Sequence, residues 1–111
     1  MTAPHLDSDN YADFIKNHEY AVIDYFATWC GPCQMMGPIF DQVAEQMAKD
    51  HPELAMAKID IDVNSQAADD AGVMTVPSLI FYRQGEEIDR NIGALMPEDL
   101  IKFINNNLPT E

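Results

Sequence analysis

Basic residues are scarce in this chain of 111 residues, where six lysines and arginines stand against 19 aspartates and glutamates and the net charge is −13. The six cations are scattered, so no basic stripe can neutralise a nucleic acid or an anionic membrane surface. Long apolar runs are lacking too, since no stretch approaches the ~20 apolar residues of a membrane span. Residues 1–10 have neither the basic start nor the apolar run of a signal peptide. The composition excludes nucleic acid and membranes as partners and predicts a cytoplasmic protein.

Cysteine is nearly absent as well, and the two that occur, Cys30 and Cys33, are only three positions apart. A pair this close cannot staple distant parts of a secreted scaffold, so we expect local and chemical pairing. The alternative is half of a zinc site, but structural zinc needs four ligands and no second cysteine pair exists. The three histidines, His5, His18 and His51, are unclustered in sequence. We therefore predict no metal site.

The apolar patterns predict a single domain over residues 1–111 in which strands and helices alternate. The two residues Gln84-Gly85 separate two expected strands and indicate a hairpin. Pro38 should kink the long helix that opens near Pro32 without breaking it. We expect Asn64 to cap a short helix that runs through Ala71, and Gly72 to end that helix in the left-handed conformation. The predicted fold is α/β, a central mixed sheet flanked by helices on both faces. The expected segments are a helix around Tyr11–Ile15, strand Tyr20–Phe26, a helix opening near Pro32, strand Leu54–Ile61, helix Asn64–Ala71, strands Ser78–Tyr82 and Glu86–Ile92, and a helix from Pro97.

The Cys-x-x-Cys pair lies where the long helix should begin, and this position favours thiolate chemistry. Unpaired backbone amides and the positive end of the helix dipole both stabilise a thiolate over a thiol. Cys30 stands at the exposed cap and is the predicted nucleophile. Cys33, one turn into the helix and expected to be more buried, should resolve the mixed disulfide that Cys30 forms. Gly31 lets the loop approach other backbones, and Pro32 fixes the loop without leaving an amide unsatisfied.

Four separated segments resemble the thioredoxin family in order and spacing, across nearly the whole chain. They are Val22-Ile23-Asp24-Tyr25-Phe26 with Trp29-Cys30-Gly31-Pro32-Cys33, Ala57-Lys58-Ile59-Asp60-Ile61-Asp62, Gly72-Val73-Met74-Thr75-Val76-Pro77-Ser78 and Ile92-Gly93-Ala94-Leu95. The resemblance implies a thioredoxin fold and a protein-disulfide reductase that cycles between a dithiol and a Cys30–Cys33 disulfide. Gln34 departs from the family's common basic residue and Phe26 from a second tryptophan, and neither touches the mechanism.

Asp24 is the one charged residue in an otherwise apolar strand, and the resemblance makes it the proton acceptor that assists Cys33. Independently of the family, a lone buried acid should have a raised pKa and exchange protons near neutrality. Lys58 matches a lysine that lies near this aspartate in the family. The alternative is that Asp24 is merely paired with Lys58, and both interpretations can hold together.

The resemblance also implies a docking surface around Cys30 for substrates and a reductase. Pro77 matches the family's cis-proline, which leaves the backbone of Val76 available to an extended substrate segment. The other expected surface residues are Trp29, Gly72, Val73, Gly93 and Ala94, although several of them could simply pack. We expect contact at Trp29, because a tryptophan beside the reactive loop is difficult to bury fully.

The partners implied by the resemblance are disulfide-containing proteins and a thioredoxin reductase that uses NADPH or ferredoxin. No bound cofactor is expected, and the chain should be a monomer. Two other functions stay open on the sequence. One is an oxidant or isomerase of an oxidising compartment, which the Gly31-Pro32 dipeptide and the missing signal disfavour. The other is a redox-silent binding module, which the presence of both cysteines and Asp24 disfavours.

Overall fold

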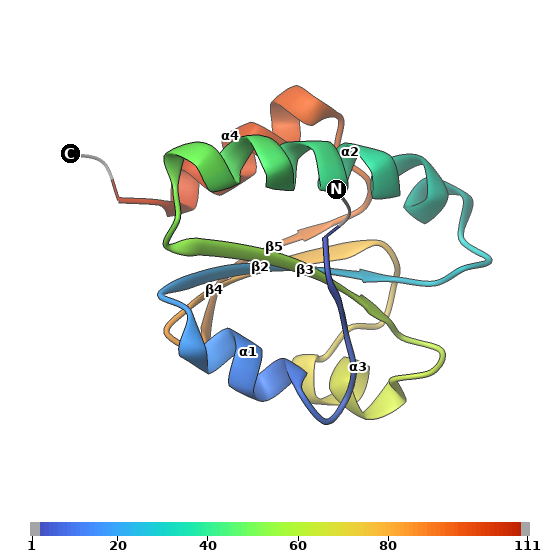
Figure 1. Ribbon diagram of the computed structural model, residues 1–111. Coiled ribbons are helices and arrows are strands. Elements are labelled where there is room, and N and C mark those ends of the chain that lie inside the picture. Colours follow the sequence, from blue (N-terminus) through green and yellow to red (C-terminus); the bar gives the residue numbers. More distant parts are fainter. Residues whose placement is uncertain (1–2, 110–111) are drawn as a thin grey trace.

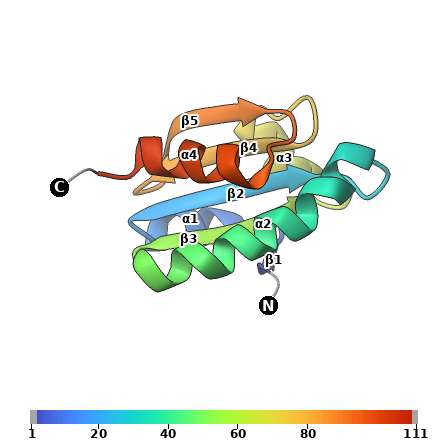
Figure 2. The ribbon, with the colours of Figure 1, turned by 90° about the horizontal axis from the view of Figure 1, so that it is seen from above.

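A five-stranded mixed sheet is the centre of the computed structural model, which describes residues 3–109. The strand order is β1-β3-β2-β4-β5, visible from above in Figure 2. β2 is parallel to β3 and β3 to β1, whereas β4 is antiparallel to both β2 and β5. This confirms the predicted mixed sheet. The strands are β1 (His5–Leu6), β2 (Tyr20–Phe26), β3 (Leu54–Asp60), β4 (Ser78–Arg83) and β5 (Glu86–Ile92).

Helices cover both faces of this sheet, as predicted. In Figure 1, α2 and α4 lie above the sheet, whereas α1 and α3 lie below it. Within residues 3–109, no helix is long and apolar enough to cross a membrane. The ends of the predicted 1–111 unit, residues 1–2 and 110–111, lie outside the described residues. The helices are α1 (Tyr11–Asn17), α2 (Gly31–Asp50), α3 (Ser65–Ala71) and α4 (Pro97–Asn107).

The central strand β2 is buried on both faces because each face contributes to a different core cluster. Val22 packs in the cluster beneath α2 and α4, and Ile23 packs in the cluster on the side of α1 and α3. Successive side chains of a strand alternate between faces. Asp24 therefore shares the face of Val22 and is directed towards α2, the helix that carries the cysteine pair.

The long helix α2 continues through Pro38 without a break, as predicted. A proline inside a helix removes one backbone hydrogen bond, so packing has to hold the helix together there. That packing comes from apolar side chains at three- and four-residue spacing. The buried residues of this face are Cys33, Met36, Phe40, Val43 and Met47.

The third helix ends as predicted but begins differently. Gly72 follows α3 with φ +67°, the left-handed conformation, and this confirms its expected role. Asn64 stands at the N-cap position, yet its side chain makes no cap hydrogen bond, so that prediction was wrong. Its Oδ1 accepts from the amide of Ser8 at 3.1 Å and its Nδ2 donates to the carbonyl of Asp60 at 3.0 Å. Asn64 ties the loop before α1 to the end of β3.

Candidate active site

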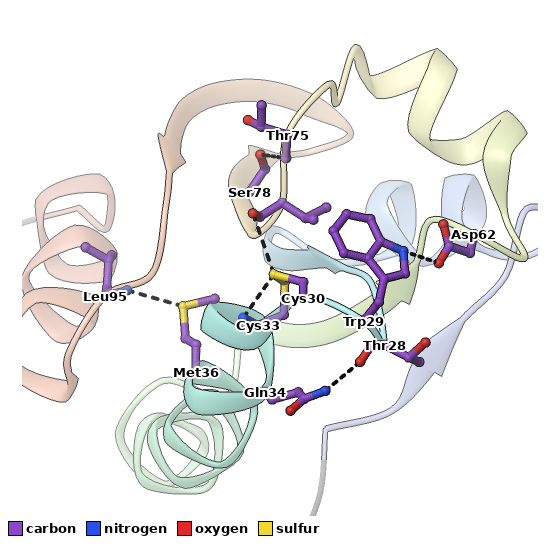
Figure 3. Close-up of a disulfide and its surroundings, with 11 residues drawn as sticks. Thr28, Trp29, Cys30, Cys33, Gln34, Met36, Asp62, Thr75, Ser78 and Leu95 are labelled. Carbon is purple, nitrogen blue, oxygen red and sulfur yellow. Dashed lines mark hydrogen bonds between the residues drawn. A yellow bond between two sulfur atoms is a disulfide. The ribbon is translucent and has the colours of Figure 1, made fainter.

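The cysteine pair lies at the junction between β2 and α2, where Cys30 is the N-cap residue of the helix. Cys30 and Cys33 form a disulfide. The Cys30 Sγ also accepts a hydrogen bond of 3.2 Å from the backbone amide of Cys33. Figure 3 shows both contacts at the first turn of α2. An amide that would otherwise lack a partner at the helix end thus points at the sulfur, which stabilises negative charge there.

The two cysteines are almost equally buried, which corrects the expectation that Cys30 is exposed and Cys33 is not. Their exposed fractions are 5% and 4%. The reason is the loop that precedes β4, because Val76 packs against the Cys30–Cys33 cluster and its carbonyl oxygen lies 3.7 Å from the Cys30 Sγ. Gly31 and Pro32, between the two cysteines, are exposed. A substrate must therefore reach Cys30 past the Val76 segment.

The loop that faces Cys30 has a fixed backbone. The Val76–Pro77 peptide bond is cis, as the resemblance implied, and Pro77 is buried. The Pro77 carbonyl accepts from the Gly93 amide at 2.9 Å, and the Ser78 hydroxyl donates to the Thr75 carbonyl at 2.7 Å. These bonds hold the Val76 carbonyl beside the sulfur, and Gly93 is thereby brought to the same site.

Asp24 is buried beneath the cysteine pair with an exposed fraction of 1%. Its Oδ1 has no hydrogen-bond partner among the described residues. Burial raises the pKa of Asp24 to about 7, while Lys58 opposes the rise and Asp41 adds to it. A carboxyl group that titrates near neutrality can both accept and release a proton at physiological pH.

Lys58 is the cross-strand neighbour of Asp24, but its ammonium group pairs with a different acid. The Nζ lies 2.9 Å from the Oδ1 of Asp41 and donates to the carbonyl of Gly37 at 3.2 Å. The interpretation of Asp24 as merely the ion-pair partner of Lys58 is therefore wrong, although Lys58 still acts on its charge. Sequence reasoning missed Asp41. The signal was present, since Cys33, Gly37 and Asp41 follow one another at four-residue spacing on a single helix face.

A cavity of about 250 Å³ lies between the cysteine pair and the buried charged side chains of β2 and β3. Asp24, Cys33 and Lys58 line it, and His5 lies at its rim with an exposed side chain. The space is large enough for water, which needs polar partners of this kind. The cavity thus offers a route by which protons reach Asp24 and Cys33.

The surface around Cys30 contains Trp29, whose exposed fraction is 69%. Its indole Nε1 donates a hydrogen bond of 2.8 Å to the Oδ2 of Asp62, a partner that sequence reasoning missed (Figure 3). Two further exposed apolar residues were also missed as surface candidates, Met74 at 93% and Ile92 at 66%. Both come from segments that carry the resemblance, so their neighbours in sequence pointed to them.

The other four residues expected on that surface differ in their placement. Val73 is buried in the core cluster on the side of α1 and α3, so its expected place in the docking surface is wrong. Ala94 packs partly against the other cluster. Gly72 is exposed, and Gly93 has φ +107°, a backbone conformation that favours glycine. The Gly72 amide donates to the Asp69 carbonyl and its carbonyl accepts from Arg90, both at 3.1 Å, so this exposed residue offers a substrate a surface to contact but no free backbone donor.

Comparison with known proteins decides the family. The thioredoxin family model matches residues 2–106. The chain belongs to the thioredoxin family. It is 33% identical to a thioredoxin of Chlamydia muridarum over 92% of this chain and 95% of that one. The structure of a mutant thioredoxin from Halobacterium salinarum has a TM-score of 0.87 and 29% identity, and covers 99% of this chain and 94% of its own.

Another relative has a longer chain. A bifunctional thioredoxin reductase/thioredoxin of Mycobacterium leprae is 29% identical over 98% of this chain, which spans 23% of that protein. Family membership and the Cys30–Cys33 disulfide make this protein a thiol–disulfide oxidoreductase that reduces protein disulfides. Among residues 3–109, no group of three or more His, Cys, Asp or Glu side chains is placed to hold a metal ion.

Proposed function

We propose that the protein is a cytoplasmic, monomeric electron carrier that takes electrons from a thioredoxin reductase and delivers them to disulfide-containing proteins. The observation that carries this proposal is the Cys30–Cys33 disulfide at the start of α2, above the buried Asp24 carboxyl group. The Mycobacterium leprae relative, whose name joins a reductase and a thioredoxin in one chain, supports a reductase as partner. NADPH or ferredoxin would be the source of electrons, used by the reductase, and the carrier itself needs no bound cofactor.

In the first step, the Cys30 thiolate attacks one sulfur of the substrate disulfide. The substrate S–S bond breaks, a mixed disulfide with Cys30 forms, and the other substrate sulfur leaves as a thiolate. The amide of Cys33, which bonds the Cys30 Sγ in the disulfide, is placed to stabilise the attacking thiolate in the reduced protein. Trp29 and the exposed backbone at Gly72 would contact the substrate, and the Val76 segment would pair with it as an added strand.

In the second step, Cys33 resolves the mixed disulfide. Asp24 accepts the Cys33 thiol proton, directly or through water in the cavity that both residues line. The Cys33 thiolate then attacks the Cys30 Sγ, so that the Cys30–Cys33 bond forms and the second substrate sulfur leaves. Two electrons have passed to the substrate, and its two thiolates take up one proton from Asp24 and one from water. Lys58 moderates the charge on Asp24 during this transfer.

An equilibrium redox titration tests the direction of electron flow. Trp29 is the only tryptophan of the chain and precedes Cys30, so its fluorescence reports the dithiol–disulfide state. A reversible two-electron transition below the potential of the glutathione pool is expected of a reductase. A midpoint well above that pool would instead indicate an oxidant or isomerase, and the absence of a reversible transition would leave only a binding module.

A trapping experiment tests the two cysteine roles separately. Cys33→Ser removes the resolving thiol, so mixed disulfides between Cys30 and substrate proteins should accumulate on non-reducing gels. Cys30→Ser is the matched control, because it keeps one thiol but removes the nucleophile. Equal trapping by both variants would contradict the assignment of Cys30 as the attacking residue.

A further inference from the structure

One buried cation lies between two acids and contacts only one of them. Lys58 on β3 is paired in register with Asp24 on β2, and both side chains face α2. The ammonium group nevertheless makes its ion pair with Asp41 on α2, at 2.9 Å. The exposed fractions of Lys58 and Asp24 are only 7% and 1%, so water does little to screen either charge.

The Asp41 carboxylate is itself held in place. Its Oδ1 accepts a hydrogen bond of 2.8 Å from the amide of Ala3, besides the contact with Lys58. The Lys58 ammonium has a second acceptor on the same helix, the carbonyl of Gly37 at 3.2 Å. Both acceptors of the ammonium therefore belong to α2, and the Oδ1 of Asp24 has no partner among the described residues.

We propose that Asp41 is a positioning residue for disulfide reduction: it retains the Lys58 ammonium on α2 and so leaves the Asp24 carboxyl group without a cationic partner and able to exchange a proton with Cys33. This inference rests on the proposed role of Asp24 as proton acceptor. The Ala3–Asp41 hydrogen bond extends the arrangement, because the segment before β1 helps to orient the carboxylate that holds the lysine.

The charged and titratable groups that face Asp24 support this arrangement from each neighbouring element. β3 contributes Lys58, α2 contributes Cys33 and Asp41, and His5 of β1 lines the same cavity. The β4 partner of Asp24 is Leu79, which is apolar. Burial is the main cause that raises the pKa of Asp24, Lys58 lowers it and Asp41 raises it. Asp41 thus favours a raised pKa of Asp24 in two ways, through its own negative charge and through its ion pair with Lys58.

The experiment is a titration of the Asp24 carboxyl carbon by NMR in the oxidised protein, where the cysteines do not titrate. Asp41→Asn keeps the size of the side chain and an oxygen for the Ala3 amide but releases Lys58. The Asp24 midpoint should fall by about one pH unit, as expected when a cation gains access to a carboxylate. Asp50→Asn removes an equal charge at the far end of α2 and should leave the midpoint in place. An unmoved midpoint in Asp41→Asn would overturn the proposal.

A variant background that lacks Lys58 separates the positioning role of Asp41 from simple charge repulsion between Asp41 and Asp24. Lys58→Met should raise the Asp24 midpoint, and in that background Asp41→Asn should shift the midpoint by less than half of its effect in the parent. Equal shifts in both backgrounds would show that Asp41 acts only by its own charge and would overturn the positioning role. Asp41→Ser, which is neutral and smaller, provides the same comparison if Asp41→Asn does not fold.

Turnover then links the titration to the reaction. The pH profile of disulfide reduction by Asp41→Asn should move to lower pH by the same amount as its Asp24 midpoint. A profile that stays in place while the midpoint moves would overturn a role of Asp41 in the reaction. The proposed role of Asp24 is tested independently with Asp24→Asn, since an unchanged turnover profile in that variant would refute the proton acceptor and not the hold of Asp41 on Lys58.

Discussion

Trp29 and Asp62 are joined by a hydrogen bond of 2.8 Å between the indole Nε1 and the carboxylate Oδ2, although 33 positions separate them in the sequence. Trp29 precedes the reactive Cys30, and Asp62 lies just after β3. The bond therefore fixes the orientation of an exposed ring beside the sulfur. A ring held in one orientation loses less conformational freedom when a substrate docks on it.

Asp62→Ala should weaken substrate docking while leaving the fold intact. One hydrogen bond to a charged group corresponds to about 1.5 kcal/mol, so kcat/KM for a disulfide protein should fall by about tenfold or less. Because the site is exposed, the free energy of unfolding should change by less than about 0.5 kcal/mol. The measurements are steady-state reduction kinetics and urea denaturation. Asp69→Ala removes an exposed acid of α3 and is the matched control. An equal loss of kcat/KM in this variant would point to surface charge instead.

The buried acid Asp24 should make stability depend on pH. Its folded pKa is raised to about 7, so the native state holds a proton that the unfolded chain has released. The free energy of unfolding should therefore fall as pH rises from about 4 to about 7, by about 4 kcal/mol, and stay low above pH 7. Urea denaturation of the oxidised protein at pH 4.5 and pH 8 measures this fall.

Asp24→Ala isolates that effect. At pH 8 the variant should be more stable than the parent by about 1–3 kcal/mol, because it removes an ionised group without a partner. At pH 4.5 the sign should reverse, and the variant should be less stable than the parent by about 1–3 kcal/mol, since the protonated acid fills space that alanine leaves empty. Asp13→Ala, an exposed acid on α1, should show neither change. A stability difference that is the same at both pH values would contradict the raised pKa.

Gly72 should resist substitution because of its backbone conformation. Its φ of +67° is left-handed, and a Cβ would meet no atom within 4 Å, so the cost is conformational and not steric crowding. Gly72→Ala should lower stability by about 1 kcal/mol and the Tm by about 4–8 °C. Gly72→Asn should cost less, because asparagine tolerates this region. Gly31→Ala, at the start of α2 with open space around it, should cost nothing measurable in thermal unfolding.

Much of the fold followed from local patterns in the sequence. The apolar run Tyr20–Phe26 is a strand with those bounds, and the three- and four-residue spacing after Cys33 is the buried face of α2. Gly72 ended α3 as expected. Such features depend on neighbours within one or two turns or on alternation along one strand, which a sequence displays directly.

The partners of the site residues could not be read in the same way. Whether Lys58 pairs with Asp24 or Asp41 depends on the register of β2 and β3 and on how α2 packs across them. The burial of Cys30 depends on Val76, which is 46 positions away. Asn64 looked like a helix cap, but tertiary contacts with Ser8 and Asp60 took its side chain instead. Each of these outcomes is a choice between competing partners that only the assembled fold decides.

Two buried tyrosines lie on the face of the sheet covered by α1 and α3, and their contributions to the free energy of unfolding should depend on each other. The hydroxyls of Tyr25 and Tyr82 lie 2.7 Å apart, and the two side chains are exposed by 0% and 7%. Burial raises the pKa of Tyr25, so both rings stay neutral and one hydroxyl donates to the other. Tyr25→Phe and Tyr82→Phe should each lower stability by about 1–2 kcal/mol, because each leaves one buried hydroxyl without this partner.

The double variant decides whether the hydroxyls act together. With both groups gone, no hydroxyl is left unsatisfied, so the loss should be smaller than the sum of the two single losses by about 1 kcal/mol. Urea denaturation at pH 7 measures all three variants. Tyr11→Phe, which loses an exposed hydrogen bond to Asp70, is the control and should change stability by less than about 0.5 kcal/mol. Additive losses from Tyr25 and Tyr82 would mean that each hydroxyl has another partner, because only a shared bond makes the second deletion cost less than the first.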